Sequence, residues 1–64
     1  MKLTFTLRKA LLQIQSNPIV TRNKSTEPVL RKLFDAGMIE AEEGETFAST
    51  LAFYLTDLGR SAIT

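Results

Sequence analysis

Residues 25–39 constrain the fold most, because a helix start, an apolar face and a helix stop follow one another there. Ser25 and Thr26 are good N-cap residues, and the proline that follows shortly after them is tolerated in a first helical turn. Apolar residues then recur at helical spacing: Val29, Leu30, Leu33 and Phe34. Gly37 stands where a helix needs a left-handed residue after its last turn. The sequence therefore predicts an amphipathic helix around residues 26–36.

The residues after Gly37 predict two strands and a short helix. Residues 39–42 alternate apolar and acidic side chains, which is the period of a half-buried strand, and Gly44 marks a turn. A second strand face then follows, made of Leu51, Phe53 and Leu55. Thr56 is placed to cap a short last helix. One core should join the helix to these strands: Leu33, Phe34, Ile39, Phe53 and Leu55.

The first part of the chain predicts one more helix and a connection. An apolar stripe of Leu3, Leu7, Leu11 and Ile14 indicates a helix over about residues 4–16, which Thr4 or Thr6 would cap. The helix should end at Asn17, because the residue before a proline disfavours helical geometry. In the connection that follows, Ile19 and Val20 are expected to enter the core.

Residues 25–60 resemble the C-terminal half of a winged helix-turn-helix DNA-binding domain. Three pieces carry the resemblance, in the right order: Leu33-x-x-x-Gly37-x-Ile39, the acidic hairpin, and Phe53-x-Leu55-Thr56-x-x-Gly59. It implies a small α+β winged-helix-like domain over residues 1–64, with two main helices, a β-hairpin wing and a short C-terminal helix. The family usually has a further helix before the recognition helix. Residues 17–25 leave room for a single helical turn over Ile19–Arg22, or for none.

Composition argues against catalysis and metal binding. The chain of 64 residues has no histidine and no cysteine, so the usual general bases, thiol nucleophiles and soft metal ligands are missing. The carboxylates gather in a turn that is expected to be solvated, Glu42-Glu43-Gly44-Glu45. We therefore expect no enzyme, no metal and no cofactor. No apolar run is long enough to span a membrane, and Arg8 and Lys9 interrupt any signal-peptide core, so a cytoplasmic protein is expected.

The charges segregate along the chain. Residues 1–32 carry seven basic and one acidic side chain, whereas residues 33–64 carry one basic and six acidic side chains. This asymmetry favours a basic face for a polyanion, although two solvated faces that happen to segregate would look the same. The resemblance implies double-stranded DNA as the partner, with the helix at 26–36 in the major groove. The candidate DNA-binding residues are Arg22, Asn23, Lys24, Ser25, Thr26, Arg31 and Lys32.

The acidic hairpin leaves other readings open. Phosphates would repel it, so this wing is not expected to touch DNA. Two alternatives remain for Phe47, Leu51 and Tyr54: they form an apolar contact patch, or they pack internally. The first interpretation is a small DNA-binding transcriptional regulator of phage or plasmid type. The alternatives are a protein-interaction or inhibitor module that uses the acidic wing, and an architectural factor that stacks head to tail on DNA. A homodimer is expected, because the uncharged β-prone residues 47–55 would pair with another chain if they lay at an edge.

Overall fold

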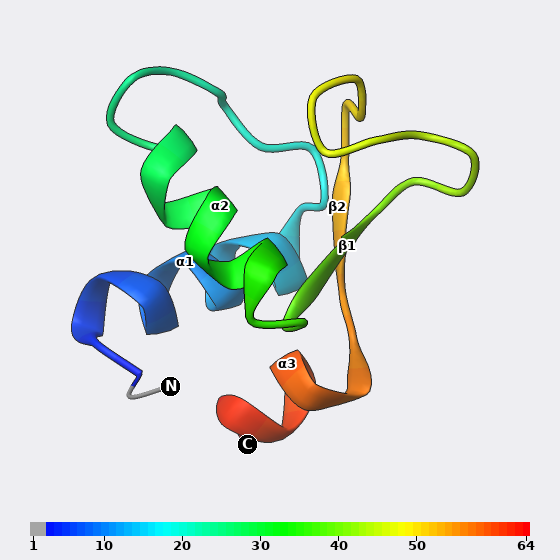
Figure 1. Cartoon of the computed structure of the whole chain (residues 1–64). Coiled ribbons are helices and arrows are strands. Elements are labelled where there is room, and N and C mark those ends of the chain that lie inside the picture. Colours follow the sequence, from blue (N-terminus) through cyan, green and yellow to red (C-terminus); the bar gives the residue numbers. More distant parts are fainter. Residues whose placement is uncertain (1–2) are drawn as a thin grey trace.

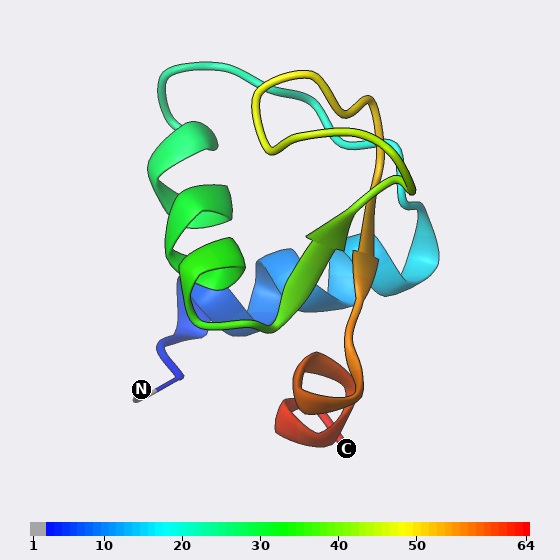
Figure 2. The same cartoon turned by 45° about the vertical axis from the view of Figure 1, so that its right-hand side comes forward.

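The computed structural model describes residues 3–64, which form the predicted α+β arrangement (Figure 1). In chain order the elements are α1 (Phe5–Ser16), α2 (Glu27–Asp35), β1 (Ile39–Ala41), β2 (Phe53–Leu55) and α3 (Asp57–Ala62). Figure 2 shows α1 running across the bases of α2 and the strands, with α3 below it in that view. The shape is compatible with a winged helix.

Helix α1 is capped by Thr4, one of the two threonines that the sequence offered as caps. The Thr4 hydroxyl accepts a hydrogen bond from the Leu7 amide at 3.2 Å, whereas Thr6 lies inside the helix. Asn17 leaves helical geometry directly before Pro18, as expected of a residue that precedes proline. The predicted stripe is buried at Leu7, Leu11 and Ile14, so α1 supplies one wall of the core.

Helix α2 ends as predicted at a left-handed glycine. Gly37 has φ 76°, and its amide donates to the carbonyl of Phe34 at 3.0 Å. The Met38 amide donates to the carbonyl of Leu33, also at 3.0 Å. These two bonds form a Schellman motif, which satisfies carbonyls that the end of a helix otherwise leaves free. The motif turns the chain directly into β1.

The start of α2 corrects the capping prediction. Thr26 occupies the N-cap position, but it has helical φ and ψ and its side chain caps no amide of α2. No helix forms between Asn17 and Thr26, so the chain adopts neither a further helix nor a helical turn over Ile19–Arg22. A tight turn at residues 23–26 leads directly into α2, because the Asn23 side chain accepts from the amides of Ser25 and Thr26 and the Asn23 carbonyl accepts from the Glu27 amide at 2.9 Å.

The two strands pair antiparallel, with Ile39 opposite Leu55 and Ala41 opposite Phe53. On its other side β2 meets the connection, because the Phe53 amide donates to the Pro18 carbonyl at 2.9 Å and Ile19 forms a bridge with Ala52. Strand β2 is therefore covered by β1 along one edge and by the connection at the beginning of the other edge. This arrangement leaves less of the exposed edge on which the predicted pairing of residues 47–55 with another chain depended.

The loop between the strands, residues 42–52, is not an extended wing. It curls through one turn closed by Glu45 and Glu42 and another closed by Thr50 and Thr46. Thr50 is only 2% exposed, and its hydroxyl accepts from the Glu42 amide at 3.0 Å while it donates to the Ala52 carbonyl at 2.6 Å. The hydroxyl thus bridges the Glu42 amide and the Ala52 carbonyl, which would face each other if the two strands continued. It extends the pairing of β1 with β2 by one residue on each strand.

The core agrees largely with the prediction. Leu33, Ile39, Phe53 and Leu55 are buried in one cluster with residues of α1, and Phe34 packs against it while partly exposed. Two expectations were wrong. Ile19 is 69% exposed, so only Val20 of that pair packs on the core. Leu51 is 76% exposed because the chain bends there before β2 begins.

Helix α3 is fixed by the threonine and glycine of the closing motif. The Thr56 hydroxyl accepts from the Gly59 amide at 3.1 Å, which confirms the predicted cap, and donates to the Gly37 carbonyl at 2.6 Å. The Thr56 amide donates to the Met38 carbonyl at 3.0 Å. The end of α2 and the start of α3 are therefore joined through one residue.

Candidate nucleic-acid interface

The turn before α2 uses its polar side chains internally. The Asn23 amide oxygen accepts from the backbone amides of Ser25 and Thr26, at 2.9 and 3.0 Å, and from the Ser25 hydroxyl at 2.7 Å. The Thr26 hydroxyl accepts from the Asn23 amide at 2.8 Å and donates to the Thr21 carbonyl at 2.9 Å. This network presents Lys24, which is exposed, next to the first turn of α2.

Arg22 is the centre of an internal cluster. Its side chain is only 20% exposed, and its guanidinium binds both carboxylate oxygens of Glu27, at 2.9 and 3.0 Å. The same group donates to the carbonyls of Phe47 at 2.6 Å and Thr50 at 3.2 Å. It also lies over the rings of Phe47 and Phe53, at 4.7 and 5.2 Å from their centroids. Arg22 therefore ties the 42–52 loop to α2.

Arg22 is one of the residues predicted to bind DNA. Because four hydrogen bonds and two rings occupy its guanidinium, it is not part of the proposed contact surface. For Phe47, a contact patch and internal packing were both open, and the structure favours packing. Phe47 is half buried, with its ring 5.1 Å from that of Phe34 and 5.5 Å from that of Phe53, measured between centroids.

The exposed side of α2 carries Arg31 and Lys32, as its apolar periodicity predicted. Arg31 forms an ion pair with Asp35 at 3.4 Å, and both side chains are more than half exposed. An exposed pair of this kind contributes about 0.2–1 kcal/mol at most, so it leaves Arg31 available for another anion. The Arg31 guanidinium also lies 4.9 Å from the centroid of Phe47. Lys32 has no ion pair within residues 3–64.

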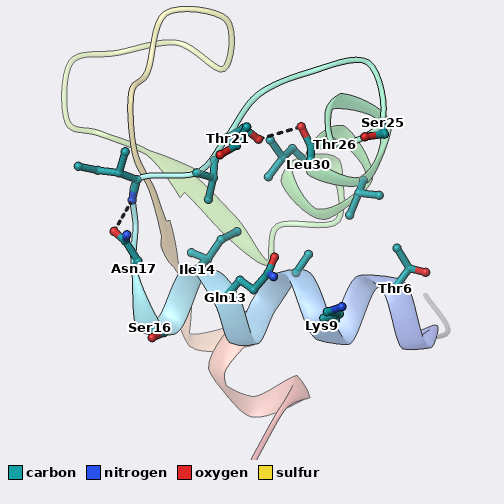
Figure 3. Close-up of a pocket in the computed structure, with 14 residues that line it drawn as sticks. Thr6, Lys9, Gln13, Ile14, Ser16, Asn17, Thr21, Ser25, Thr26 and Leu30 are labelled. Atoms are coloured by element: carbon teal, nitrogen blue, oxygen red, sulfur yellow. Dashed lines mark hydrogen bonds between the residues drawn. The ribbon is translucent and has the colours of Figure 1, made fainter.

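An open groove lies beside this face, between α1, the connection and α2 (Figure 3). Its volume is about 610 Å³. The floor is apolar, and Figure 3 shows Ile14 and Leu30 pointing into the space from the two helices. The polar rim includes Lys9, Gln13 and Ser25.

All residues that line this groove except Val29 and Leu30 belong to a stretch without carboxylates. Residues 3–26 contain no aspartate and no glutamate. The first carboxylate of the chain, Glu27, is bound by Arg22, and Asp35 is paired with Arg31. Lys9 lines the groove, while Lys24 neighbours its rim residue Ser25. The end of the molecule formed by α1, the turn and α2 is therefore electropositive; Lys2, counted among the basic residues, lies outside the described residues.

The acidic residues of the 42–52 loop lie beyond the strands. Glu43 and Glu45 are exposed there, and Figures 1 and 2 show the beginning of this loop on the far side of the strands from α2. Glu42 is half buried and holds the loop through its backbone amide. The later part of the loop returns to α2, where Phe47 lies beside Arg31, so the charge segregation along the sequence is only partly a segregation in space.

Metal binding and membrane insertion gain no support from residues 3–64. No group of three or more acidic, histidine or cysteine side chains in that range could hold a metal ion. None of its helices is both long and apolar enough to cross a membrane.

Comparison with known proteins leaves this surface as the main guide to function. No protein-family model matches the chain, and neither a curated protein nor a solved structure matches it.

The sequence did not reveal the roles of Thr50 and Lys9 in the site, nor the pairing of Arg22 with Glu27. Nothing in the sequence distinguishes Thr50 from other loop hydroxyls, and its role depends on a contact with Glu42 eight positions away. The pairing of Arg22 with Glu27 likewise spans a turn whose geometry no periodicity predicts. The exposure of Lys9 could have been predicted, because helical periodicity places it away from the buried stripe of α1.

Proposed function

We propose that this protein is a small DNA-binding regulator that presents the exposed side of α2 to double-stranded DNA. The observation that carries the proposal is the gathering of Lys24, Arg31 and Lys32 on and just before that exposed side, where the carboxylates of Glu27 and Asp35 are each in an ion pair. Lysine and arginine side chains supply phosphate contacts, and arginine also reads guanine in the major groove. The resemblance of residues 25–60 to a winged helix-turn-helix agrees with this choice of helix.

The residues divide into two roles in this proposal. Lys24 and Lys32 bind phosphates, because each is exposed and has no ion pair within residues 3–64. Arg31 reads a base edge, since it exchanges the exposed carboxylate of Asp35 for a guanine. Asn23, Ser25 and Thr26 act indirectly by fixing the turn that carries Lys24.

The test is fluorescence anisotropy with genomic DNA fragments at two or more salt concentrations. Lys24→Gln and Lys32→Gln should each weaken binding to all sequences and reduce the salt slope by about one unit. Arg31→Gln should cost about 1–3 kcal/mol on the preferred fragment and relax preference at one position. Arg60→Gln removes the same charge from α3, outside the proposed contact surface, and serves as the control.

Two results would remove the proposal. One is that no fragment binds at low salt. The other is that Lys24→Gln and Lys32→Gln bind as the parent does while Arg60→Gln does not. Glu43→Lys should leave specific binding intact, because the acidic loop is not expected to contact DNA.

A second candidate function is a protein-interaction module. It is favoured by the exposed carboxylates of Glu43 and Glu45 near Leu51, which is 76% exposed. An acidic surface with one exposed apolar residue suits a basic protein better than it suits phosphates. If Glu43→Lys abolished an activity that Lys24→Gln leaves untouched, this function would replace DNA binding.

A further inference from the structure

The groove between α1 and α2 has no occupant from its own chain among the described residues, and its chemistry differs from that of the DNA-facing side of α2. Its floor is apolar, formed in part by Ala10, Val20 and Val29, which are only partly buried. A volume of about 610 Å³ lies within the range of protein sites that hold ligands, about 300–1,000 Å³. A duplex backbone would leave this apolar floor uncovered.

The charge around the groove restricts what can enter it. Lys9 is the one ionisable side chain among the residues that line the groove. Lys24 adjoins its rim, and Lys32 lies one turn after Val29 on the same side of α2. All groove-lining residues except Val29 and Leu30 come from residues 3–26, which contain no carboxylate. An entering segment is therefore favoured if it carries negative charge beside an apolar stripe.

The walls also determine the form of the segment. Helix α1 forms one wall and Val29 and Leu30 of α2 another, and the backbone groups of both helices bond internally, so neither offers a free edge to an extended strand. The connection forms the third wall, and its Ile19 is already paired with Ala52. An occupant must be recognised through side chains that fit between α1 and α2. An amphipathic helix meets this requirement, because its residues at i, i+3, i+4 and i+7 form one stripe.

We propose that this groove is a docking site for an amphipathic helix of a partner protein, with its apolar stripe flanked by aspartate and glutamate. The stripe packs on Val20, Val29 and Ala10, while the flanking carboxylates meet Lys9 on one side and Lys24 or Lys32 on the other. The apolar floor and Lys9 are not part of the proposed DNA surface, whereas Lys24 and Lys32 belong to both sites, so the helix is tested without DNA.

The probe is a synthetic helix with leucine at i, i+3, i+4 and i+7 and glutamate at the flanking positions, titrated into the ¹⁵N-labelled protein without DNA. The amide signals of Ala10, Gln13 and Val29 should shift in a saturable manner. A peptide with the same leucines and lysine in place of glutamate should bind at least about fivefold more weakly.

Two variants on α1 form a matched pair. Lys9→Glu reverses the charge that lines the groove and should lower the affinity for the glutamate peptide by about five- to tenfold. Arg8→Glu makes the same change one residue earlier, outside the groove, and should leave the affinity within about twofold. Both residues are exposed, so neither variant should disturb folding.

Three results would overturn the proposal: neither peptide shifts the groove amides, both peptides bind equally well, or the two variants lose equal affinity. A duplex DNA that shifts these amides when the glutamate peptide does not would assign the groove to the DNA interface. Peptide binding in a protein that fails to bind any duplex would confirm the groove and remove only the proposed DNA function.

Discussion

The backbone carbonyl of Met38 lies directly against the α-carbon of Gly59. A Cβ added at residue 59 would stand 2.1 Å from that carbonyl oxygen, and 3.0 Å from its carbon. Since the Met38 oxygen also accepts from the Thr56 amide, it cannot move without breaking the pairing of the two chain segments. The glycine of the closing motif is therefore required by close contact.

We predict that Gly59→Ala destabilises the domain, although alanine is the better helix former by about 1 kcal/mol. The overlap with backbone should outweigh that gain and lower the free energy of unfolding by about 1–3 kcal/mol. Chemical denaturation followed by circular dichroism measures the effect. Ser61→Ala, at an exposed position of the same helix, is the control; an equal or higher stability for Gly59→Ala would contradict the close contact.

Thr50→Val should cost about 1–3 kcal/mol, because it keeps the shape of a buried side chain but leaves the Glu42 amide and the Ala52 carbonyl without their partner. Hydrogen exchange offers a local measurement. The Glu42 amide should lose protection in the variant while the amides of α1 keep theirs. Ser49→Ala, in the exposed part of the same loop, should change neither quantity by as much.

Arg22 and Glu27 should be strongly coupled. Arg22→Gln alone leaves the carbonyls of Phe47 and Thr50 with fewer donors, and Glu27→Gln alone leaves a half-buried guanidinium without its carboxylate. A double-mutant cycle should give a coupling energy of about 0.5–3 kcal/mol, above that of exposed pairs. Arg31 and Asp35 form the comparison pair, and a cycle there should give about 0.2–1 kcal/mol. Equal couplings for the two pairs would show that the Arg22 cluster has no special role.

We expect self-association to depend on exposed side chains and not on a strand edge. We expect light scattering to show a dimer that Leu51→Ser or Ile19→Ser weakens, because these residues are 76% and 69% exposed on neighbouring parts of the surface. Tyr54→Ser is a useful third variant, since that side chain is 45% exposed on β2. A protein that stays monomeric over a wide range of concentration would end the expectation of a dimer.

The sequence predicted those parts of the fold that depend on near neighbours. The cap at Thr4, the left-handed Gly37 and the cap at Thr56 are each decided within a few residues, and all three are confirmed. The core residues Leu33 and Phe53 followed from periodicity. The predicted burial of Ile19 and Leu51 was wrong for one shared reason. Each residue lies at or next to a bend, where the alternation of a strand no longer tells which side chains are buried.

The site was less predictable than the fold. Exposure of Arg31 and Lys32 followed from the apolar face of α2, but the burial of Arg22 did not. A guanidinium that binds loop carbonyls is recognised only when the path of the loop is known. The groove likewise depends on the route of residues 17–26, which form a turn and an extended segment in place of a helix.

The hydrogen bonds of the Thr50 hydroxyl determine which part of the 42–52 loop can change in length. Because the Thr50 hydroxyl holds Glu42 and the Arg22 guanidinium holds the carbonyl of Phe47, residues 43–45 lie in the exposed stretch between two fixed points. A Cβ placed at Gly44 would meet nothing within 4 Å. Residues could be inserted there, as a short peptide tag or a site for a fluorescent label, with little expected effect on the rest of the domain.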